Sequence, residues 1–343
     1  MTPPSVVSAV RPRWAIPGGR IAIQGIQLPV PVDGPPHVLV GTHDARVVAA
    51  SSSAIKLVVP VEAEGGTMPV RIDELPGETA YLEVATVFAT GVHQVDSPVF
   101  DASGRLCVTQ SGGRDTKVPV PLYRVSHEGI REPLAVEIAN PTSMVLGPDR
   151  AMYVSSRFEG QVYRLGDHDR AEVYASELGV ATGLAFAPDG TLFVGDRSGS
   201  ILAVLPDKRV EIFATLPASV AAFHLAFGPD GCLYVAAPTF ATHDPVYRIR
   251  PDRTVETVYD GFGRPQGLAF DANGALYVVE ALAGAAGLYR LDVSTRTTTP
   301  ELIVAAPALV GVTMDPRGGL ILASNEVVWR LDVDVHPPGR SAR

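Results

Sequence analysis

The chain has only two cysteines in 343 residues, Cys107 and Cys232, so no disulfide framework holds it together. It also lacks runs of lysine and arginine. With a net charge of −9, this excludes nucleic acid as the main partner. No apolar run approaches the roughly 20 residues that a membrane-spanning helix needs. The first residues lack the basic stretch and apolar segment of a secretory signal. We therefore expect no membrane partner and a cytoplasmic location.

Aromatic residues are also scarce, at 7% of the chain, whereas glycine (33) and proline (30) are plentiful. This balance indicates many turns and short strands. A hydrophobic fraction of 46% with 19% charged residues is typical of a folded globular protein, not of a disordered one.

One pattern recurs through the last three quarters of the chain. Its copies begin at residues 96, 142, 182, 223, 266 and 310, 40 to 46 residues apart. They are "DSPVFDASGRLCVT", "TSMVLGPDRAMYVS", "TGLAFAPDGTLFVG", "FHLAFGPDGCLYVA", "QGLAFDANGALYVV" and "VGVTMDPRGGLILA". This period is typical of the four-stranded blades of a β-propeller.

Each copy contains an apolar strand, a tight turn such as "APDG" and a second strand, and every copy but the last is followed by two further strands. The inner strands are almost continuously apolar, which indicates sheets packed on both of their faces. The last copy is followed by only one further strand, whereas "LEVATVFATG" (82–91) precedes the first copy. We expect segment 82–91 to close the final blade, because closure removes exposed strand edges. Cys107 and Cys232 then lie across the ring, too far apart to bond.

The first 80 residues alternate short strands with glycine turns, over a length suited to an immunoglobulin-like sandwich. Pro17, Gly18, Gly19 and Gly25, and the later strand from Val38 to Ala45, resemble the IPT/TIG family. The sequence thus predicts an all-β protein: a β-sandwich at 1–80, a six-bladed propeller at 81–335 and a flexible tail at 336–343. The sandwich is a candidate surface for a protein partner.

The loops of the repeats are unequal in length. Turns between first and second strands are short, whereas some loops between second and third strands are long: 110–121, 237–245 and 280–287. In an antiparallel pair, the start of one strand lies beside the end of the next. The long loops and the first residue of each copy therefore share one face, where we expect binding.

The repeats resemble the NHL and SMP-30/gluconolactonase/strictosidine-synthase-like group of six-bladed propellers over residues 82–335. "DSPVFD" is similar to a signature of gluconolactonase-like propellers, with Asp96 where that family has a metal-binding Glu. The resemblance implies further ligands at equivalent ring positions, which here are Thr142, Thr182 and Gln266 instead of Asn and Asp.

These substitutions leave a weak set of metal ligands. A strong Ca²⁺ or Mg²⁺ site uses several carboxylate and carbonyl oxygens, whereas this ring has one carboxylate, one amide and two hydroxyls. We therefore expect that no cofactor is required. The alternative is a Ca²⁺-type divalent ion held by Asp96 and Gln266, with help from Glu280. The residues expected to bind a ligand at this face are Asp96, Thr142, Thr182, Phe223, Arg264, Gln266 and Glu280.

His224 follows the ring position in its repeat and is the one histidine expected near the axis. It is a candidate general base, since a histidine titrates near neutrality, or else a hydrogen-bonded structural residue. The pairs Asp196–Arg197 and Arg157–Glu159 occupy equivalent loop entries and are interpreted as braces between neighbouring blades.

Three functions are compatible with the sequence. The leading hypothesis is a binding protein that recognises a small molecule or peptide at the face with the long loops. The first alternative is a metal-dependent lactone or ester hydrolase with a degenerate metal site. The second is a structural propeller that assembles through its N-terminal sandwich. Fold resemblance does not choose among them, because propellers host many functions.

Overall fold

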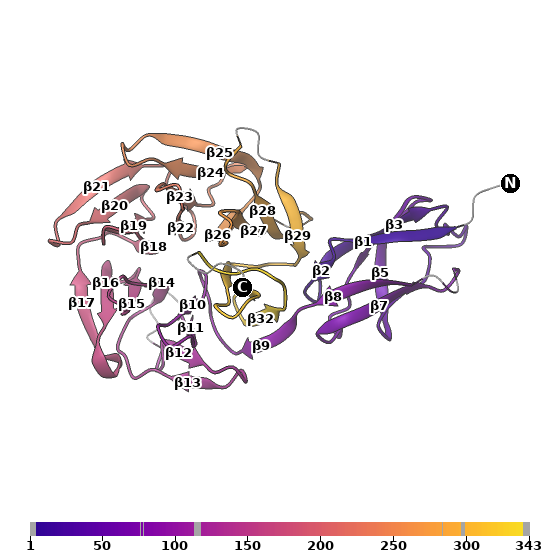
Figure 1. Cartoon of the computed structure of the whole chain (residues 1–343), viewed down its shortest axis with the longest axis horizontal. Coiled ribbons are helices and arrows are strands. Elements are labelled where there is room, and N and C mark those ends of the chain that lie inside the picture. Colours follow the sequence, from indigo (N-terminus) through magenta and orange to yellow (C-terminus); the bar gives the residue numbers. More distant parts are fainter. Residues whose placement is uncertain are drawn as a thin grey trace.

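Most of the repeats form separate antiparallel sheets of four strands, arranged as blades around an axis (Figure 1). The computed structural model describes residues 5–75, 77, 79–112, 118–282, 284–295 and 299–338. The first blade consists of β10 (Val99–Phe100), β11 (Leu106–Thr109), β12 (Leu122–Val125) and β13 (Arg131–Pro133). The second consists of β14 (Pro141–Leu146), β15 (Met152–Ser156), β16 (Gln161–Leu165) and β17 (Ala171–Ala175), with a short helix η1 (Asp167–Asp169) before β17.

The third and fourth blades repeat this arrangement. The third consists of β18 (Ala181–Phe186), β19 (Leu192–Asp196), β20 (Ser200–Val204) and β21 (Val210–Thr215). The fourth consists of β22 (His224–Phe227), β23 (Leu233–Ala236), β24 (Asp244–Ile249) and β25 (Val255–Phe262). All residues of the second strands β19 and β23 are buried, as the apolar pattern predicts. In the tight turns, Gly190 and Gly231 have φ angles of +87° and +76°, the left-handed region that favours glycine.

The last blade is closed by a strand from far earlier in the chain. It contains β30 (Gly311–Met314), β31 (Leu320–Ala323), β32 (Val327–Leu331) and β9 (Thr86–Thr90). Strand β9 pairs antiparallel with β32, Thr90 opposite Val327. The predicted closing pair is thus confirmed over 86–90, whereas 82–84 belong to the preceding strand β8.

The prediction of six separate blades and a separate sandwich is wrong. Five blades are separate four-stranded sheets. The strands expected to form the remaining blade are β26 (Pro265–Phe270), β27 (Leu276–Glu280), β28 (Gly287–Leu291) and β29 (Glu301–Ala305). They are the end of a 12-stranded sheet that continues into the N-terminal strands in the order β1-β3-β6-β5-β4-β7-β8-β2-β29-β28-β27-β26. These strands lie between the fourth and the last blade (Figure 1).

The N-terminal strands occupy one side of the ring and pack around a shared apolar core (Figure 1). They are β1 (Val6–Arg11), β2 (Trp14–Ala15), β3 (Arg20–Ile26), β4 (Val38–Val40), β5 (His43–Ala50), β6 (Ala54–Val58), β7 (Gly66–Ile72) and β8 (Thr79–Val84). Because their sheet continues into the ring, they are not clearly separated from it as a sandwich of their own. The IPT/TIG assignment stays a prediction.

The join depends on the two-residue strand β2, which pairs in parallel with both β8 and β29. The amide of Ile16 donates to the carbonyl oxygen of Ala305, at 2.9 Å. A Cβ atom at Gly19 would lie 2.3 Å from that same oxygen. The "PGG" stretch therefore needs glycine at position 19 because the propeller backbone passes too close for any side chain.

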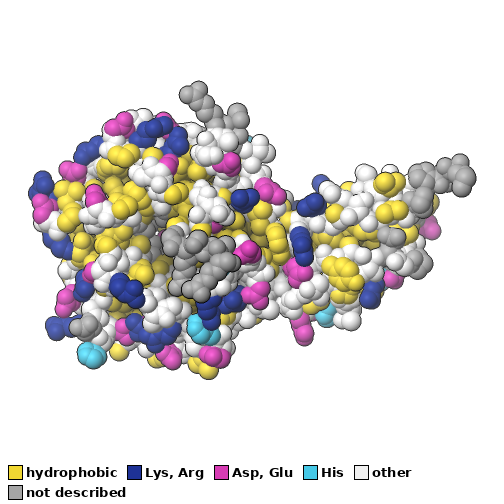
Figure 2. Space-filling model, in the orientation of Figure 1, with side chains coloured by type: hydrophobic (Ala, Val, Ile, Leu, Met, Phe, Trp, Pro, Cys, Tyr) yellow, Lys and Arg dark blue, Asp and Glu magenta, His cyan; other side chains and the backbone are white. Residues whose placement is uncertain are grey.

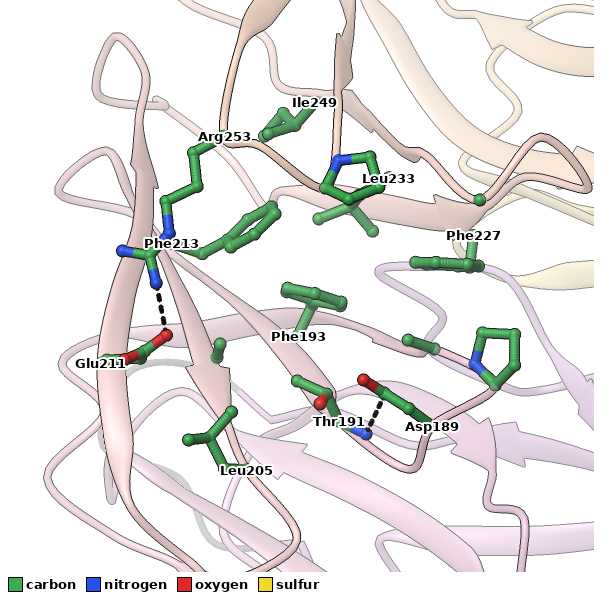
Figure 3. A pocket seen from close by; sticks show the side chains of 15 residues that line it. Asp189, Thr191, Phe193, Leu205, Glu211, Phe213, Phe227, Leu233, Ile249 and Arg253 are labelled. Atoms are coloured by element: carbon green, nitrogen blue, oxygen red, sulfur yellow. Dashed lines mark hydrogen bonds and ion pairs between the residues drawn. The ribbon is translucent and has the colours of Figure 1, made fainter.

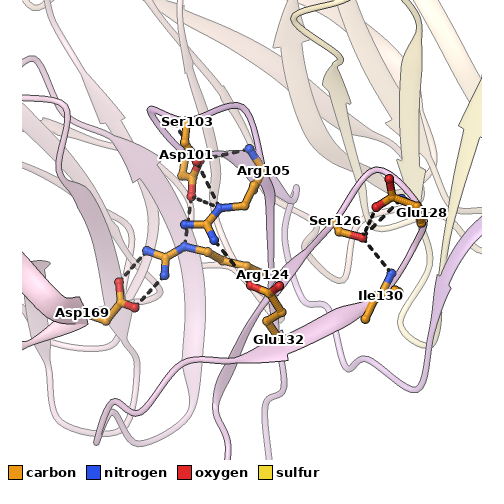
Figure 4. A network of polar contacts seen from close by, with 9 residues as sticks. All are labelled: Asp101, Ser103, Arg105, Arg124, Ser126, Glu128, Ile130, Glu132 and Asp169. Carbon is orange, nitrogen blue, oxygen red and sulfur yellow. Dashed lines mark hydrogen bonds and ion pairs between the residues drawn. The ribbon is translucent and has the colours of Figure 1, made fainter.

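Ion pairs connect neighbouring blades on the face with the short turns (Figure 4). Arg124 in β12 donates from Nη1 to Asp169 Oδ2 of the second blade at 2.6 Å, and from Nε to Asp101 Oδ2 at 3.0 Å. Hydrogen bonding to Asp169 raises the pKa of Arg124 above its usual value. Because Arg124 binds a carboxylate of each blade, these charge-assisted contacts fix the relative position of the two blades.

Charge over the rest of the surface is mixed. Figure 2 shows acidic and basic side chains interspersed around the propeller, with hydrophobic side chains between them. No helix in the part of the chain that the structure describes is long and apolar enough to cross a membrane. Both cysteines are buried and free, and burial raises the pKa of Cys107 to about 12 and that of Cys232 to about 11. Neither thiol is therefore suited to nucleophilic chemistry near neutral pH.

Candidate functional site

A cavity of about 260 Å³ lies at the axis of the ring, which we call the axial cavity. Starts of first strands and ends of second strands meet there: Ala181 pairs with Asp196, and Pro265 with Glu280. The cavity wall combines arginines, uncharged polar groups and small apolar side chains. The lining residues are Val95, Arg157, Thr182, Arg197, Val220, Ala221, Ala222, His224, Arg264, Gln266, Val310 and Asn325.

His224 and Asp96 form a hydrogen bond across the ring. Asp96 precedes the first blade and His224 begins β22 of the fourth, yet His224 Nδ1 and Asp96 Oδ1 are 2.7 Å apart. The same carboxylate oxygen accepts the amide hydrogen of Ser97, also at 2.7 Å. Asp96 and His224 are only 6% and 1% exposed. Asp96 thus fixes the orientation of the His224 ring at the cavity wall.

Four of the residues expected to bind a ligand or act in catalysis come together in the axial cavity, namely Thr182, His224, Arg264 and Gln266. Thr182 is also a structural link, because its Oγ1 donates to Gly195 O at 2.8 Å and accepts from the amide of Phe223 at 3.0 Å. Gln266 is 9% exposed. Arg264 is exposed, and no bond within the protein engages its guanidinium among the described residues, so it is the more available of these for a ligand.

The remaining predicted residues have other surroundings. Phe223 is fully buried in the apolar cluster between the third and fourth blades. Thr142 is buried and donates from Oγ1 to Asn140 O at 3.3 Å. Glu280 accepts hydrogen bonds from the amides of Gly263, at 2.6 Å, and Arg264, at 2.9 Å. Its carboxylate thereby holds the backbone from which Arg264 reaches the cavity.

The residues at the axis do not fit a divalent metal ion. Asp96 Oδ1 is already bonded to His224 and Ser97, and Thr182 Oγ1 to two backbone groups. Among the described residues, no three His, Cys, Asp or Glu side chains are grouped closely enough to hold a metal. Three guanidinium groups also line the cavity and would repel a cation. The axial cavity lacks the oxygen-rich, anionic surroundings that Ca²⁺ requires.

Sequence reasoning missed two of the three arginines. Arg157 directly follows β15 and Arg197 directly follows β19, the same position in consecutive blades. Asp196 accepts the amide of Val180 at 2.8 Å and so stabilises a loop, as a brace would. Its neighbour Arg197, in contrast, lines the axial cavity. The usable signal was the recurrence of arginine at one position of two adjacent repeats.

The described parts of the long loops supply none of the residues that line the axial cavity. The wall segment 220–222 comes from the connection between β21 and β22, which loop length did not single out. Part of loop 110–121 (113–117), one residue of loop 280–287 (283) and tail residues 339–343 lie outside the described residues. Phe240 in loop 237–245 is 96% exposed and points into solvent.

A second, larger cavity of about 440 Å³ lies on the opposite face, between the third and fourth blades (Figure 3). Its wall is mostly apolar, with the rings of Phe193, Phe213 and Phe227 in the close-up. The charged groups at its rim pair with each other, since Arg253 Nη2 donates to Glu211 Oε1 at 2.6 Å. It is a gap between packed blades rather than a site with converging polar groups.

Sheets set as blades around an axial cavity define a β-propeller protein. Residues 158–336 match the family model "SMP-30/Gluconolactonase/LRE-like region", and the chain belongs to this family. The matched segment contains Thr182, His224, Arg264 and Gln266. The NHL assignment stays a prediction. No curated protein sequence matches the chain significantly.

Several solved structures share the fold at low sequence identity. An auxiliary nutrient binding protein from Bacteroides ovatus has 14% identity and a TM-score of 0.56, over 96% of this chain and 98% of that chain. A gluconolactonase from Xanthomonas campestris has 17% identity and a TM-score of 0.52, over 72% and 86%. A virginiamycin B lyase from Staphylococcus aureus has 12% identity and a TM-score of 0.53, over 72% and 97%. At these identities the similarity shows the fold alone.

Proposed function

We propose that this protein binds a small organic molecule in the axial cavity. The supporting observation is the convergence of polar side chains from separate blades, including Thr182, His224 and Gln266, on one partly enclosed space. Small apolar side chains such as Ala221 and Ala222 complete the wall. Ligand sites use converging polar groups to fix the orientation of the ligand, and seven of the twelve residues that line this cavity are polar or charged.

The size of the cavity limits the ligand. Its volume of about 260 Å³ is slightly below the range of about 300–1,000 Å³ typical of sites for drug-sized ligands. A metabolite-sized molecule fits, whereas a folded peptide does not. Of the partners expected from the sequence, the small molecule is therefore the one that the geometry favours.

A blocked cavity tests this proposal. Ala222→Trp places an indole in the axial cavity, and Ala272→Trp adds the same side chain in an exposed turn on the opposite face. A panel of small metabolites is screened by thermal shift, and compounds that stabilise the wild type are measured by calorimetry. We expect binding to be lost in Ala222→Trp and kept in Ala272→Trp, with unchanged circular dichroism spectra. Equal binding to both variants would place the ligand elsewhere.

A lactone or ester hydrolase is the second candidate. The 2.7 Å contact between Asp96 and His224 favours it, because a carboxylate that orients an imidazole is a common arrangement for a general base. With Nδ1 bonded to Asp96, His224 Nε2 is the atom left to accept a proton from an attacking water. Because the axial residues do not fit a metal, this version requires no metal ion.

A lactone panel tests the hydrolase directly. Turnover by the wild type should persist in EDTA and fall at least about 100-fold in His224→Gln, the lower bound of a typical general-base contribution. Turnover that EDTA abolishes, or that His224→Gln retains, would contradict this metal-independent mechanism. Binding of intact ligands without any turnover would leave the binding protein as the better description.

A further inference from the structure

The axial cavity has an unusual excess of positive charge. Arg157, Arg197 and Arg264 all line it, in a protein whose net charge is −9. Arg157 and Arg197 also line an adjoining cavity of about 350 Å³. They project from the same position of the second and third blades, directly after β15 and β19. The fold therefore brings two guanidinium groups together instead of separating them.

These arginines lack the carboxylate partners that other arginines of the ring have. Arg157 Nη2 has one long contact, at 3.5 Å to Gly112 O, and Arg197 Nη2 donates to Val220 O at 3.0 Å. Across the described ranges, no carboxylate lies within 4.0 Å of either guanidinium, in contrast to Arg124 and its partners. A guanidinium has five N–H donors, so most donors of both groups have no hydrogen bond to a described residue.

Three acidic side chains of the ring already have hydrogen-bond donors of their own. Asp196 and Glu280 accept backbone amide hydrogens at the ends of their strands, and Asp96 is bonded to His224. Burial, and then the charge of Arg197, lower the pKa of Arg157 below its usual value. Two like charges that share a partly buried space destabilise each other unless an anion is present.

Buried polar atoms beside these arginines also have no partner. Arg197 Nε and Asn140 Oδ1 are both buried without a hydrogen bond, and Asn140 lines the adjoining cavity with both arginines. Nearly all buried polar groups in proteins are bonded to protein or water. Two unpartnered groups at one place indicate that a polar ligand completes the site.

We propose that Arg157, Arg197 and Arg264 form a binding site for a small molecule that carries an oxyanion, either a carboxylate or a phosphate. This inference rests on the proposed function and specifies its ligand class. The planar guanidinium fork matches the paired oxygens of both groups. The unpartnered amide oxygen of Asn140 can accept a hydrogen bond from a hydroxyl or amino group of the ligand. A site of this kind favours anions where the family resemblance implies a cation.

Calorimetry with two probes, inorganic phosphate and succinate at constant ionic strength, tests the proposal. The variants Arg157→Gln and Arg197→Gln remove one charge each, and Arg71→Gln does the same at an exposed position on β7. We expect at least one probe to bind the wild type, each cavity variant to weaken it at least tenfold, and Arg71→Gln to leave it within twofold. Succinate binding identifies a carboxylate ligand and phosphate binding a phosphate ligand. Absence of binding by both, or binding that the cavity variants retain, would overturn the proposal.

A measurement without ligand provides an independent check. In buffer free of multivalent anions, Arg157→Gln should raise the midpoint of thermal unfolding, because it removes a like-charge contact. A lower midpoint would show that Arg157 already has its counter-charge within the protein, and would overturn the proposal. Neutral compounds that bind the wild type and the arginine variants equally, but not Ala222→Trp, would refute the anion site while the proposed axial binding function survived.

Discussion

The hydrogen bond between Asp96 and His224 ties the first blade to the fourth across the axis, and its removal has a calculable effect. Asp96→Ala deletes two hydrogen bonds to one carboxylate oxygen, from His224 Nδ1 and from the amide of Ser97. A hydrogen bond to a charged group contributes about 1.5–3 kcal/mol. Because the His224 ring would stay buried without a partner, we expect the free energy of unfolding to fall by about 3–5 kcal/mol.

Asp96→Asn is the matched variant, because its amide oxygen can still accept from His224 without the charge. We expect it to lower the free energy of unfolding by only about 1 kcal/mol. Urea unfolding followed by tryptophan fluorescence measures both variants. Adding His224→Ala and the double variant completes a double-mutant cycle, for which we expect a coupling energy of about 2 kcal/mol. A coupling energy below about 0.5 kcal/mol, the scatter found for independent sites, would refute the cross-axis tie.

Three further predictions concern the join, the blades and one titrating group. Gly19→Ala should lower the free energy of unfolding by about 2 kcal/mol through overpacking. The control is Gly166→Ala, where an added Cβ would lie 3.6 Å from the nearest atom, and it should change the free energy of unfolding by less than about 0.5 kcal/mol. Equal urea midpoints for the two variants would contradict this. Arg124→Met should lower the free energy of unfolding by about 2 kcal/mol, a value between those typical of exposed and of buried ion pairs. An unchanged midpoint of thermal unfolding would count against a role of Arg124 in connecting the blades. Hydrogen bonding to Asp73 raises the pKa of His37 above 6.5 in the folded protein. The contact between protonated His37 and Asp73 therefore stabilises the fold fully below pH 6.5, and this contribution is lost as the pH rises through the pKa of the folded state. An NMR titration midpoint above 6.5 that Asp73→Asn lowers is expected, and a midpoint at or below 6.5 would disprove it.

The blades were predictable because their signals are local. Each copy carries an apolar strand, a tight turn and a second apolar strand within about 14 residues, and in five of the six copies a glycine of the turn takes a positive φ. The closing strand was also predictable, because the last copy lacked a fourth strand and β9 supplied one. The 12-stranded sheet that joins the N-terminal strands to the ring was not predictable, because β2 has only two residues and its partner β29 lies almost 300 residues further along the chain.

The candidate site likewise contains residues that the sequence indicated and contacts that it did not. Position in the repeat indicated Thr182, His224 and Gln266, because equivalent residues of stacked repeats converge on the axis. It gave no sign that Asp96 would bond to His224, which is 128 residues away. Arg157 and Arg197 were interpreted as braces between neighbouring blades, because they occupy equivalent loop entries in adjacent repeats. That both line the same cavities, with no carboxylate partner among the described residues, depends on how adjacent blades are placed in the ring.

The sequence by itself determined that this is a repeat protein of small sheets around an axis, since period, turn chemistry and apolar strands are all written within single copies. Tertiary structure alone decided how the ring joins its N-terminal strands and which charges meet at its centre. Both depend on contacts between residues far apart in the chain, which no local pattern encodes. The charges at the axis therefore became visible only in three dimensions. One carboxylate is bonded to a histidine, and three guanidinium groups have no carboxylate partner within the part of the chain that the structure describes.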